Sequence, residues 1–176
     1  MSPISYQGPL EIDEKSRHTH SQSAESSMGL GQPGLTVESM LSDRKGVVHS
    51  VTPHSPVKEV VAELSRLRIG ALVVIDNSNE PIGIVTERDI VHCAEKHGAA
   101  MFDLLSEAIM TADPKVCHPE DKIESVMKRM SDGGFRHMPV TDGGKLIGLV
   151  SIRDVVRHRM MEIEYENLKM RQAIVG

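Results

Sequence analysis

The sequence is poor in aromatic residues: it has no tryptophan, two phenylalanines and two tyrosines among 176 residues. Proteins that bind nucleic acid usually combine a basic surface with stacking rings. This chain offers neither, because its formal net charge is -5. We therefore expect no nucleic-acid partner, and a core built from Val, Ile, Leu, Met and Ala.

Long apolar segments and disulfide-forming patterns are also missing. The longest apolar run, Ala71 to Ile75, has the length of a strand, whereas a membrane span needs about 20 apolar residues. The N-terminus resembles neither a secretory signal nor a transit peptide. The two cysteines, Cys93 and Cys117, do not suggest a disulfide scaffold, which favours a reducing compartment. We expect a cytoplasmic protein without membrane contact.

The first part of the sequence differs in composition from the rest. Residues 1–34 are rich in Ser, Gly, Gln and His and contain few large apolar side chains. Such a segment cannot bury enough surface to offset the entropy lost on ordering, so it is predicted to be a disordered tail. The remaining length suits one soluble globular domain.

The body of the sequence is a tandem repeat. Equivalent residues stand 66 positions apart: Pro53 and Pro119, Val60 and Val126, Val74 and Val140. The shift drops to 65 after the next turn, where Gly83 corresponds to Gly148, and turns tolerate length changes best. We assign residues 35–105 to repeat 1, 106–160 to repeat 2 and 161–176 to a C-terminal helix extension.

The first copy reads as strand, helix, strand, strand, helix. The apolar spacing predicts a strand over 47–51, a helix with Ser55 as N-cap and Pro56 at its first position, and an end of that helix at Gly70. Strands over 71–75 and 82–85 follow. Thr86 is expected to cap a helix that runs to about Lys96. A short helix capped by Thr36 precedes these elements.

The second copy repeats the same order. Val116 marks a short strand, a helix with an apolar face ends at Gly133-Gly134, and strands over 135–140 and 147–150 lead to a last helix capped by Ser151. The predicted fold class is α/β (α+β), with two β-α-β-β-α repeats packed about a pseudo-two-fold axis.

Each copy contains one short motif: Gly, two apolar residues, a hydroxyl residue, a variable residue, Arg and Asp. Thr86-x-x-Asp89 and Ser151-x-x-Asp154 match a helix capping box, which needs no ligand. The same residues also suit a ribose phosphate, because Asp can bind two neighbouring hydroxyls and helix-start amides attract phosphate. Arg88 and Arg153 suit phosphate oxygens but are equally explained by ion pairs with acids of the other copy. Both interpretations stay open.

Two further features join the doubled motif: the strand Arg136-His137-Met138-Pro139-Val140 and the Pro-x-x-x-[Val/Ile] helix start. Together they resemble a tandem pair of cystathionine β-synthase (CBS) domains, the Bateman module, over about residues 36–160. The resemblance implies two clefts between the copies that bind an adenine nucleotide, with AMP as the first candidate and ATP, ADP and NAD as the others. It also implies a non-catalytic regulatory homodimer that acts on an unidentified partner protein.

The resemblance also assigns residues to the two clefts. Thr86 and Asp89 would hold the ribose in one cleft, and Ser151 and Asp154 in the other. Guanidinium chemistry, rather than the resemblance, suggests Arg88 and Arg153 for the phosphate, and Arg136 adds a cation in the second copy. The adenine pocket and the segments that close it would comprise Phe135, His137, Met138 and Pro139 of the second copy, Ile69, Ala71 and Leu72 of the first, and Val51, Thr52, Val116 and Cys117. Gly70 stands where the second copy has Arg136, so we expect unequal sites.

Other functions find less support in the sequence. No paired acids and no nucleophile–base pair indicate an enzyme, and the His and Cys residues lack zinc-ligand spacing, so no metal is expected. The alternative function is a structural homodimerisation module with vestigial clefts. The last helix has a coiled-coil-like pattern, which indicates either self-association or packing on the chain's own body. This pattern comprises Val156, Met160, Ile163, Asn167, Met170 and Ile174.

Overall fold

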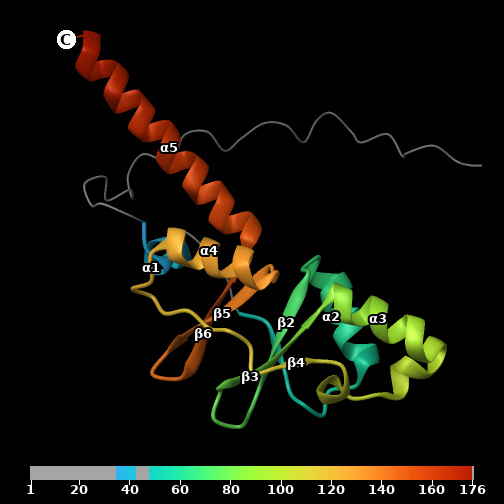
Figure 1. The fold of residues 1–176 in the computed structure, drawn as a ribbon. Helices are drawn as coiled ribbons and strands as arrows, with labels where there is room; N and C mark the ends of the chain where they lie inside the picture. The colour runs from blue at the N-terminus through green and yellow to red at the C-terminus, as the bar shows by residue number, and fades with distance from the viewer. Residues whose placement is uncertain (1–34, 43–47, 176) are drawn as a thin grey trace, which may run out of the picture. The chain divides into compact units, whose positions relative to one another are not determined.

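The computed structural model describes residues 35–42 and 48–175, with side chains up to residue 173. The predicted tail and the first residue of the strand predicted over 47–51 lie outside these ranges. In chain order the elements are α1 (Val37–Ser42), β1 (Ser50–Val51), α2 (Val57–Leu67), β2 (Ala71–Ile75), β3 (Pro81–Thr86), α3 (Glu87–His97), η2 (Gly98–Asp103), η3 (Ser106–Ala108), β4 (Thr111–Ala112), α4 (Ile123–Gly133), β5 (His137–Asp142), β6 (Lys145–Ser151) and α5 (Ile152–Val175) (Figure 1).

Two small sheets carry the two repeats, and the predicted mixed α/β class with two similar halves is confirmed. The first sheet has the order β1-β2-β3-β4, and the second is the hairpin β5-β6. Strand β1 runs parallel to β2, while β2, β3 and β4 pair antiparallel. The second hairpin has the same antiparallel register and the same irregularity near its turn as the first, which reflects the repeat.

Helix α2 has the predicted apolar face but different ends. Val57, Val60 and Leu64 are buried, as their i, i+3, i+7 spacing predicts. The N-cap is Pro56 without a side-chain bond, because the Ser55 hydroxyl instead accepts the amide of Thr52 at 3.1 Å. The helix ends at Arg68, whose left-handed φ of 54° closes it before Gly70. The predictions for Ser55 and Gly70 were therefore wrong.

The second repeat departs from prediction at its first strand. Val116 lies in no strand, and the neighbouring Cys117 forms only a single parallel bridge with Val140. The bridge consists of the Cys117 amide donating to the Pro139 carbonyl and the Thr141 amide donating to Cys117, both at 2.9 Å. Strand β5 starts at residue 137, two residues later than predicted. The predicted end of α4 is confirmed, with Gly134 in the left-handed conformation.

The short helix α1 lies at the start of the segment assigned to repeat 1 but packs on repeat 2. Its Val37 and Met40 are 0% and 2% exposed and belong to the core cluster of repeat 2. The amides of Val37 and Glu38 donate to the carbonyls of Asp121 and Pro119, each at 2.9 Å. In Figure 1, α1 accordingly lies beside α4.

The first residues of the segment assigned to repeat 2 make the equivalent contacts with repeat 1. The amide of Ser106 donates to the Ser55 carbonyl at 2.8 Å, and that of Glu107 donates to Pro53 at 3.1 Å. Strand β4 extends the sheet of repeat 1 by pairing with β3. The first residues of each assigned repeat therefore complete the other repeat, which ties the two repeats together.

Glycines at equivalent strand positions permit this exchange. A Cβ at Gly83 in β3 would lie 2.3 Å from the sulfur of Met110, and one at Gly148 in β6 would lie 2.9 Å from Leu41 Cδ1. Because these glycines have no side chain, Met110 can lie against β3 and Leu41 can lie against β6.

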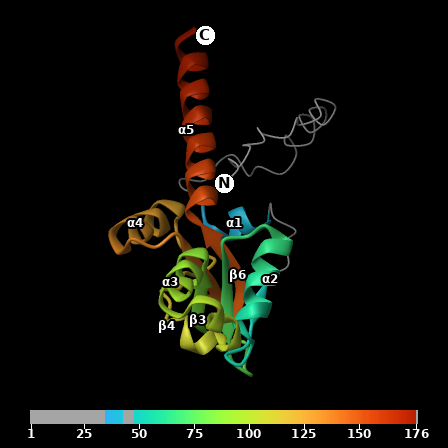
Figure 2. The ribbon, with the colours of Figure 1, turned by 90° about the vertical axis from the view of Figure 1, so that its right-hand side faces the viewer.

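Helix α5 is the longest element, with 24 residues. Its first turns contact α4, and its C-terminal half continues beyond the other described elements (Figures 1 and 2). Although α5 is long, no helix among the described residues is apolar enough to cross a membrane.

Candidate functional site

The first half of the site is the junction of β3 and α3. The Thr86 hydroxyl accepts the amide of Asp89 at 3.4 Å, and Asp89 Oδ2 accepts the Thr86 amide at 2.8 Å and its hydroxyl at 2.6 Å. This is a complete capping box, which fixes the carboxylate at the helix start. Both bonds of the Asp89 carboxylate end on Oδ2, so Oδ1 is available to a further donor.

The junction of β6 and α5 repeats this geometry. The Asp154 amide donates to the Ser151 hydroxyl oxygen at 3.3 Å, and the Ser151 amide donates to Asp154 Oδ2 at 3.3 Å. The Ser151 hydroxyl donates to the same carboxylate oxygen. Asp154 is more enclosed than Asp89, with 7% of its surface exposed. The capping-box interpretation is confirmed at both helices.

A backbone bond anchors each helix start to the hairpin beside it. The first amide of α3, from Glu87, donates to the Gly70 carbonyl at 3.1 Å. The first amide of α5, from Ile152, donates to the Arg136 carbonyl at 2.8 Å. The residues at 70 and 136 therefore sit beside the two helix starts.

The larger of two clefts, about 660 Å³ in volume, contains the start of α5. Both repeats contribute to it, so it lies between them. Its lining comprises Leu41, Val48, His49, Arg68, Ile69, Gly70, Ala71, Glu87, Arg136, His137, Ile147, Gly148, Leu149, Ser151, Ile152, Arg153 and Asp154.

The smaller cleft, about 260 Å³, contains the start of α3. It too combines both repeats, because the end of α4 and the start of β5 form its other wall. Its lining comprises Gly70, Ile84, Thr86, Glu87, Arg88, Asp89, Thr111, Gly134, Phe135, Arg136 and His137.

The two clefts meet at four residues that line both: Gly70, Glu87, Arg136 and His137. A Cβ at position 70 would lie 3.3 Å from the His137 ring, so glycine allows the two strands to approach here. Arg136 has no basic counterpart in repeat 1, but its position gives a guanidinium group to both clefts. The clefts differ in volume, and the expected inequality of the two binding sites stays a prediction.

The clefts also differ in their cations. Arg68, Arg136 and Arg153 line the larger one, while Arg88 and Arg136 line the smaller. Neither Arg88 nor Arg153 forms an ion pair with an acid in the part of the chain that the structure describes. Within the described ranges, the ion-pair alternative for these two arginines is therefore not supported.

His137 lies where the two clefts meet. Burial lowers its pKa below the ordinary 6.5, and the nearby carboxylates of Glu87 and Asp154 counteract this only in part, while Arg136 adds to the lowering. The imidazole is therefore neutral near pH 7 and becomes a cation more readily when an anion enters either cleft.

Most of the predicted ligand residues line the clefts. The larger cleft has Ile69, Ala71, Arg136, His137, Ser151, Arg153 and Asp154, and the smaller has Thr86, Arg88, Asp89, Phe135, Arg136 and His137. Three others, Leu72, Met138 and Cys117, are 0% exposed and belong to the core. The placement of Met138 follows from strand alternation, because Met138 must face opposite to its neighbour His137 in β5.

The segments predicted to close the pockets are held elsewhere. Val51, Thr52, Val116 and Pro139 do not occur in the described lining of either cleft. The Val116 carbonyl accepts Arg129 Nη1 at 3.1 Å, and the Thr52 carbonyl accepts the Ser106 hydroxyl at 2.6 Å. These backbone groups therefore serve the packing of each repeat.

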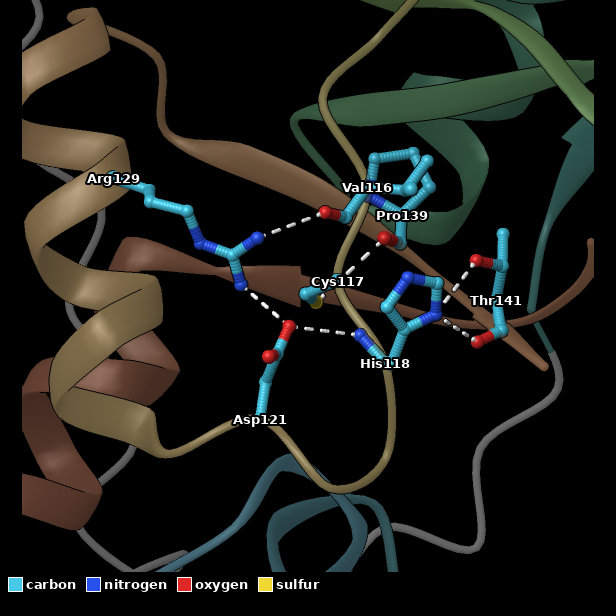
Figure 3. Close-up of polar contacts among 7 residues, drawn as sticks. All are labelled: Val116, Cys117, His118, Asp121, Arg129, Pro139 and Thr141. Atoms are coloured by element: carbon cyan, nitrogen blue, oxygen red, sulfur yellow. Dashed lines mark hydrogen bonds and ion pairs between the residues drawn. The ribbon is translucent and has the colours of Figure 1, made fainter.

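Figure 3 shows that a polar cluster fixes the segment around Cys117. Arg129 Nη2 lies 2.5 Å from Asp121 Oδ2, which also accepts the His118 amide at 3.0 Å. Burial opposes ionisation of Asp121, but these two bonds outweigh it and lower the pKa of the carboxyl. The His118 ring is 3.0 Å from the Thr141 carbonyl, a bond whose direction depends on the tautomer. The cluster joins α4 to β5, so its role is structural.

Sequence reasoning missed several lining residues. Val48 and His49 line the larger cleft in place of Val51 and Thr52, and Arg68 and Glu87 were not assigned to it. Glu87 stands at the variable position of the motif, where the two copies differ, so the repeat did not mark it as a site residue. Arg68 reaches the cleft because α2 ends there, which the repeat pattern did not indicate.

Metal binding and thiol chemistry find no support in the described residues. No group of three or more His, Cys, Asp or Glu side chains is placed to hold a metal ion among them. Burial raises the pKa of Cys117 to about 12, and Cys93 is only 6% exposed. A thiol that stays protonated and enclosed is a poor nucleophile.

The fold and its paired clefts define a class of protein, and comparison with known sequences identifies it. The CBS domain family matches residues 43–96 and 105–160, so the chain belongs to the CBS domain family and carries a tandem pair. A 17.7 kDa protein of Acidianus ambivalens is 39% identical over 111 residues, 62% of this chain and 66% of that protein. The mitochondrial CBS domain-containing protein CBSX3 of Arabidopsis thaliana is 33% identical over 129 residues, 71% of this chain and 63% of that protein.

Solved structures give the same result. A CBS-domain-containing protein of Agrobacterium tumefaciens has a TM-score of 0.68 at 34% identity, covering 71% of this chain and 99% of that one. A CBS domain protein of Pyrobaculum aerophilum complexed with AMP has a TM-score of 0.65 at 25% identity, covering 76% and 99%. The CBS domain pair of protein MJ0100, complexed with 5′-methylthioadenosine and S-adenosylmethionine, has a TM-score of 0.62 at 25% identity, covering 74% and 99%.

Proposed function

We propose that this protein is a non-catalytic sensor that binds an adenine nucleotide, with AMP as the first candidate, in the larger cleft. The observation that carries the proposal is the start of α5. There, Ser151 and Asp154 stand at a helix N-terminus inside a cleft of about 660 Å³ that also contains Arg136 and Arg153.

Each part of a nucleoside monophosphate has a complementary group in this cleft. The Asp154 carboxylate can accept both hydroxyls of a ribose, since its position is fixed by Ser151. Arginine and the positive end of a helix dipole both favour phosphate. Apolar side chains such as Ile69 and Val48 provide a surface for the base.

The size of the larger cleft supports its choice over the smaller one. Small-molecule sites generally measure about 300–1,000 Å³, a range that includes 660 Å³ but not the 260 Å³ of the smaller cleft. The smaller cleft also has one arginine fewer. We infer that Thr86 and Asp89 form a weaker second site.

The ligands of similar proteins support an adenosine-containing ligand for this chain. AMP, 5′-methylthioadenosine and S-adenosylmethionine, bound by the Pyrobaculum protein and by MJ0100, share an adenosine. For this chain, the three arginines of the larger cleft favour a ligand with a phosphate group. ADP, ATP and NAD have the same adenosine and remain candidates for the ligand.

We infer that the output of binding is regulatory. Both clefts are lined by the two repeats, and in this proposal the signal of ligand binding passes to another protein. Because both repeats line each cleft, a ligand that favours one arrangement of the repeats would shift their packing. A homodimer in the cytoplasm is the form in which we expect this regulation to occur.

The alternative function, a structural assembly module, is favoured by a specific observation. Helix α5 presents exposed apolar side chains, with Ile163 and Met170 at 42% and 59% exposure. Under this alternative the clefts would be vestigial, and nucleotides would not stabilise the protein.

A matched pair of variants tests the proposal. We would measure the melting temperature of the wild type with AMP, ADP, ATP, NAD, NADH, S-adenosylmethionine and GTP, then determine the affinity of the best ligand by calorimetry. At a hundredfold excess over Kd, binding should add about 2.7 kcal/mol of stability. Asp154→Asn should weaken the affinity at least tenfold, whereas Asp89→Asn makes the same change in the smaller cleft and should leave the main site within about threefold.

Three results would count against this assignment. Equal losses from the two variants would show that the larger cleft is not the principal site. A loss from Asp89→Asn alone would move the nucleotide to the smaller cleft. An absence of stabilisation by every adenine compound would favour the assembly alternative.

A further inference from the structure

The exposed face of α5 contains a stripe of apolar residues that no described part of the chain covers. Met160, Ile163 and Met170 are 58%, 42% and 59% exposed. Together with Val156, at 42% exposure, they recur at alternating steps of four and three residues, with Asn167 completing the series. We call Val156, Met160, Ile163, Asn167 and Met170 the α5 seam.

The α5 seam lies on a different side of the helix from the face that contacts repeat 2. That contacting face is marked by Val155, which is 0% exposed, and by Arg159, which pairs with Glu124 of α4 at 2.9 Å. Successive residues of a helix are turned by about 100°, so Val156 points well away from Val155. The α5 seam therefore adjoins the contacting face at Arg159 and turns away from it at Val156 and Met160.

The pattern of the seam specifies how a second helix would lie. In a heptad, Val156, Ile163 and Met170 take the d positions, and Met160 and Asn167 take the a positions. A single Asn among apolar a and d residues is a known determinant of register and of the two-stranded state, because two Asn side chains can bond to each other only when they meet. They meet when two copies of α5 run parallel and in register.

The flanking charges select the same arrangement. In a parallel pair, each g position faces the e position five residues later in the other chain. Glu166 would then face Arg171 of the second copy, and Arg159 would face Glu164 of the second copy. Both of these contacts join opposite charges, and each occurs twice in a symmetric dimer. Because Arg159 already pairs with Glu124 and Glu162, the contact of Glu166 with Arg171 is the more informative one.

The opposite orientation brings like charges together. In an antiparallel pair that keeps the seam in contact, Glu166 lies opposite Glu166 of the second copy, and Arg157 lies opposite Arg171. Asn167 would face Ile163 and would be buried without a bonding partner, which is unfavourable. The charges and the Asn position thus disfavour this arrangement.

We propose that two copies of this chain associate through the α5 seam as a parallel, in-register, two-stranded coiled coil. The contact runs over residues 156–170, about 22 Å of helix at 1.5 Å per residue. It lies on the extension that follows the CBS pair and is independent of the nucleotide proposal.

Cysteine crosslinking tests the orientation directly on the full chain. In a parallel, in-register pair, Met170→Cys places two thiols across the seam within reach of a disulfide, so mild oxidation should convert most of the protein to a covalent dimer. Gln172→Cys, on the outer face of the helix, is the matched control and should form at least tenfold less covalent dimer. The native thiols contribute little, because Cys93 and Cys117 are 6% and 0% exposed. Equal crosslinking of the two variants, or none, overturns the proposal.

Charge exchange tests the register. Glu166→Arg replaces two attractive contacts of the dimer by repulsive ones and should raise the dimer Kd by at least tenfold, as measured by sedimentation equilibrium. Adding Arg171→Glu to this variant restores opposite charges and should return the Kd to within about threefold of the wild type. A single variant that associates as tightly as the wild type, or a double variant that is no better than the single one, refutes the parallel register.

Two exposed apolar residues of the same helix provide a test of the seam itself. Ile163→Asp lies in the seam and should weaken association at least tenfold, whereas Leu168→Asp lies outside it and should not. Both side chains are exposed in the single chain, at 42% and 54%, so neither change should disturb folding. Equal behaviour of these two variants would also overturn the proposal.

Discussion

Replacing Met40 by alanine should destabilise repeat 2, although Met40 lies in the segment assigned to repeat 1. The side chain is 2% exposed and packs in the core cluster formed with Ile123, Met130 and Val140. Truncating a buried methionine costs about 2–5 kcal/mol, with the larger values where neighbours cannot collapse into the space. Hydrogen bonds from α1 to Pro119 and Asp121 hold its backbone in place, so we expect a loss of about 3 kcal/mol.

This loss is a large share of the total stability of a typical domain, about 5–15 kcal/mol. Urea unfolding gives the free energy of unfolding, and amide hydrogen exchange shows where protection is lost. We expect the faster exchange first in α4 and β5. Val91→Ala is the control, because Val91 is 64% exposed and should change stability by less than about 0.5 kcal/mol. A loss below about 1 kcal/mol, or faster exchange in β2 and β3 with α4 unaffected, would refute the assignment of α1 to repeat 2.

Two further predictions concern titratable groups. Because Cys117 has a pKa of about 12 and both thiols are buried, a thiol-specific reagent should label neither Cys93 nor Cys117 in the native protein and both in denaturant; rapid native labelling of Cys117 would contradict this. Since burial keeps the pKa of His137 below 6.5, the unfolded chain binds more protons than the folded one in the window below pH 6.5, so the free energy of unfolding should fall as the pH drops through that window. Between pH 7.5 and 5.5, urea unfolding should show a smaller decrease in the free energy of unfolding for His137→Gln than for the wild type. Identical pH dependences of the two proteins would contradict the prediction.

The sequence predicted the features that depend on neighbouring residues. The apolar face of α2 follows from the spacing of Val57, Val60 and Leu64, and the capping boxes follow from residues three positions apart. Both are local, since a helix brings such residues together wherever it forms. The strands β2 and β6 and the glycine end of α4 were likewise predicted from patterns of neighbouring residues.

Local pattern was insufficient at the ends of elements and at the first strand of repeat 2. The φ of 54° at Arg68 ended α2 where the sequence shows no glycine. Cys117 and Leu72 were predicted to be ligand residues, yet both are 0% exposed and belong to the core. For Leu72 the reason is that alternation along a strand depends on a register that the sequence left open by one residue.

The sequence by itself determined that there are two equivalent units, with a hydroxyl and a carboxylate fixed at the start of a helix in each. The tertiary structure alone decided that α1 completes repeat 2 while residues 106–112 complete repeat 1. It also decided that Arg136 and His137 line both clefts, and that the α5 seam is left uncovered by the described chain. The physical reason is that hydrophobic periodicity states which face of a segment is buried but not which distant segment buries it, and that choice depends on how the two repeats pack.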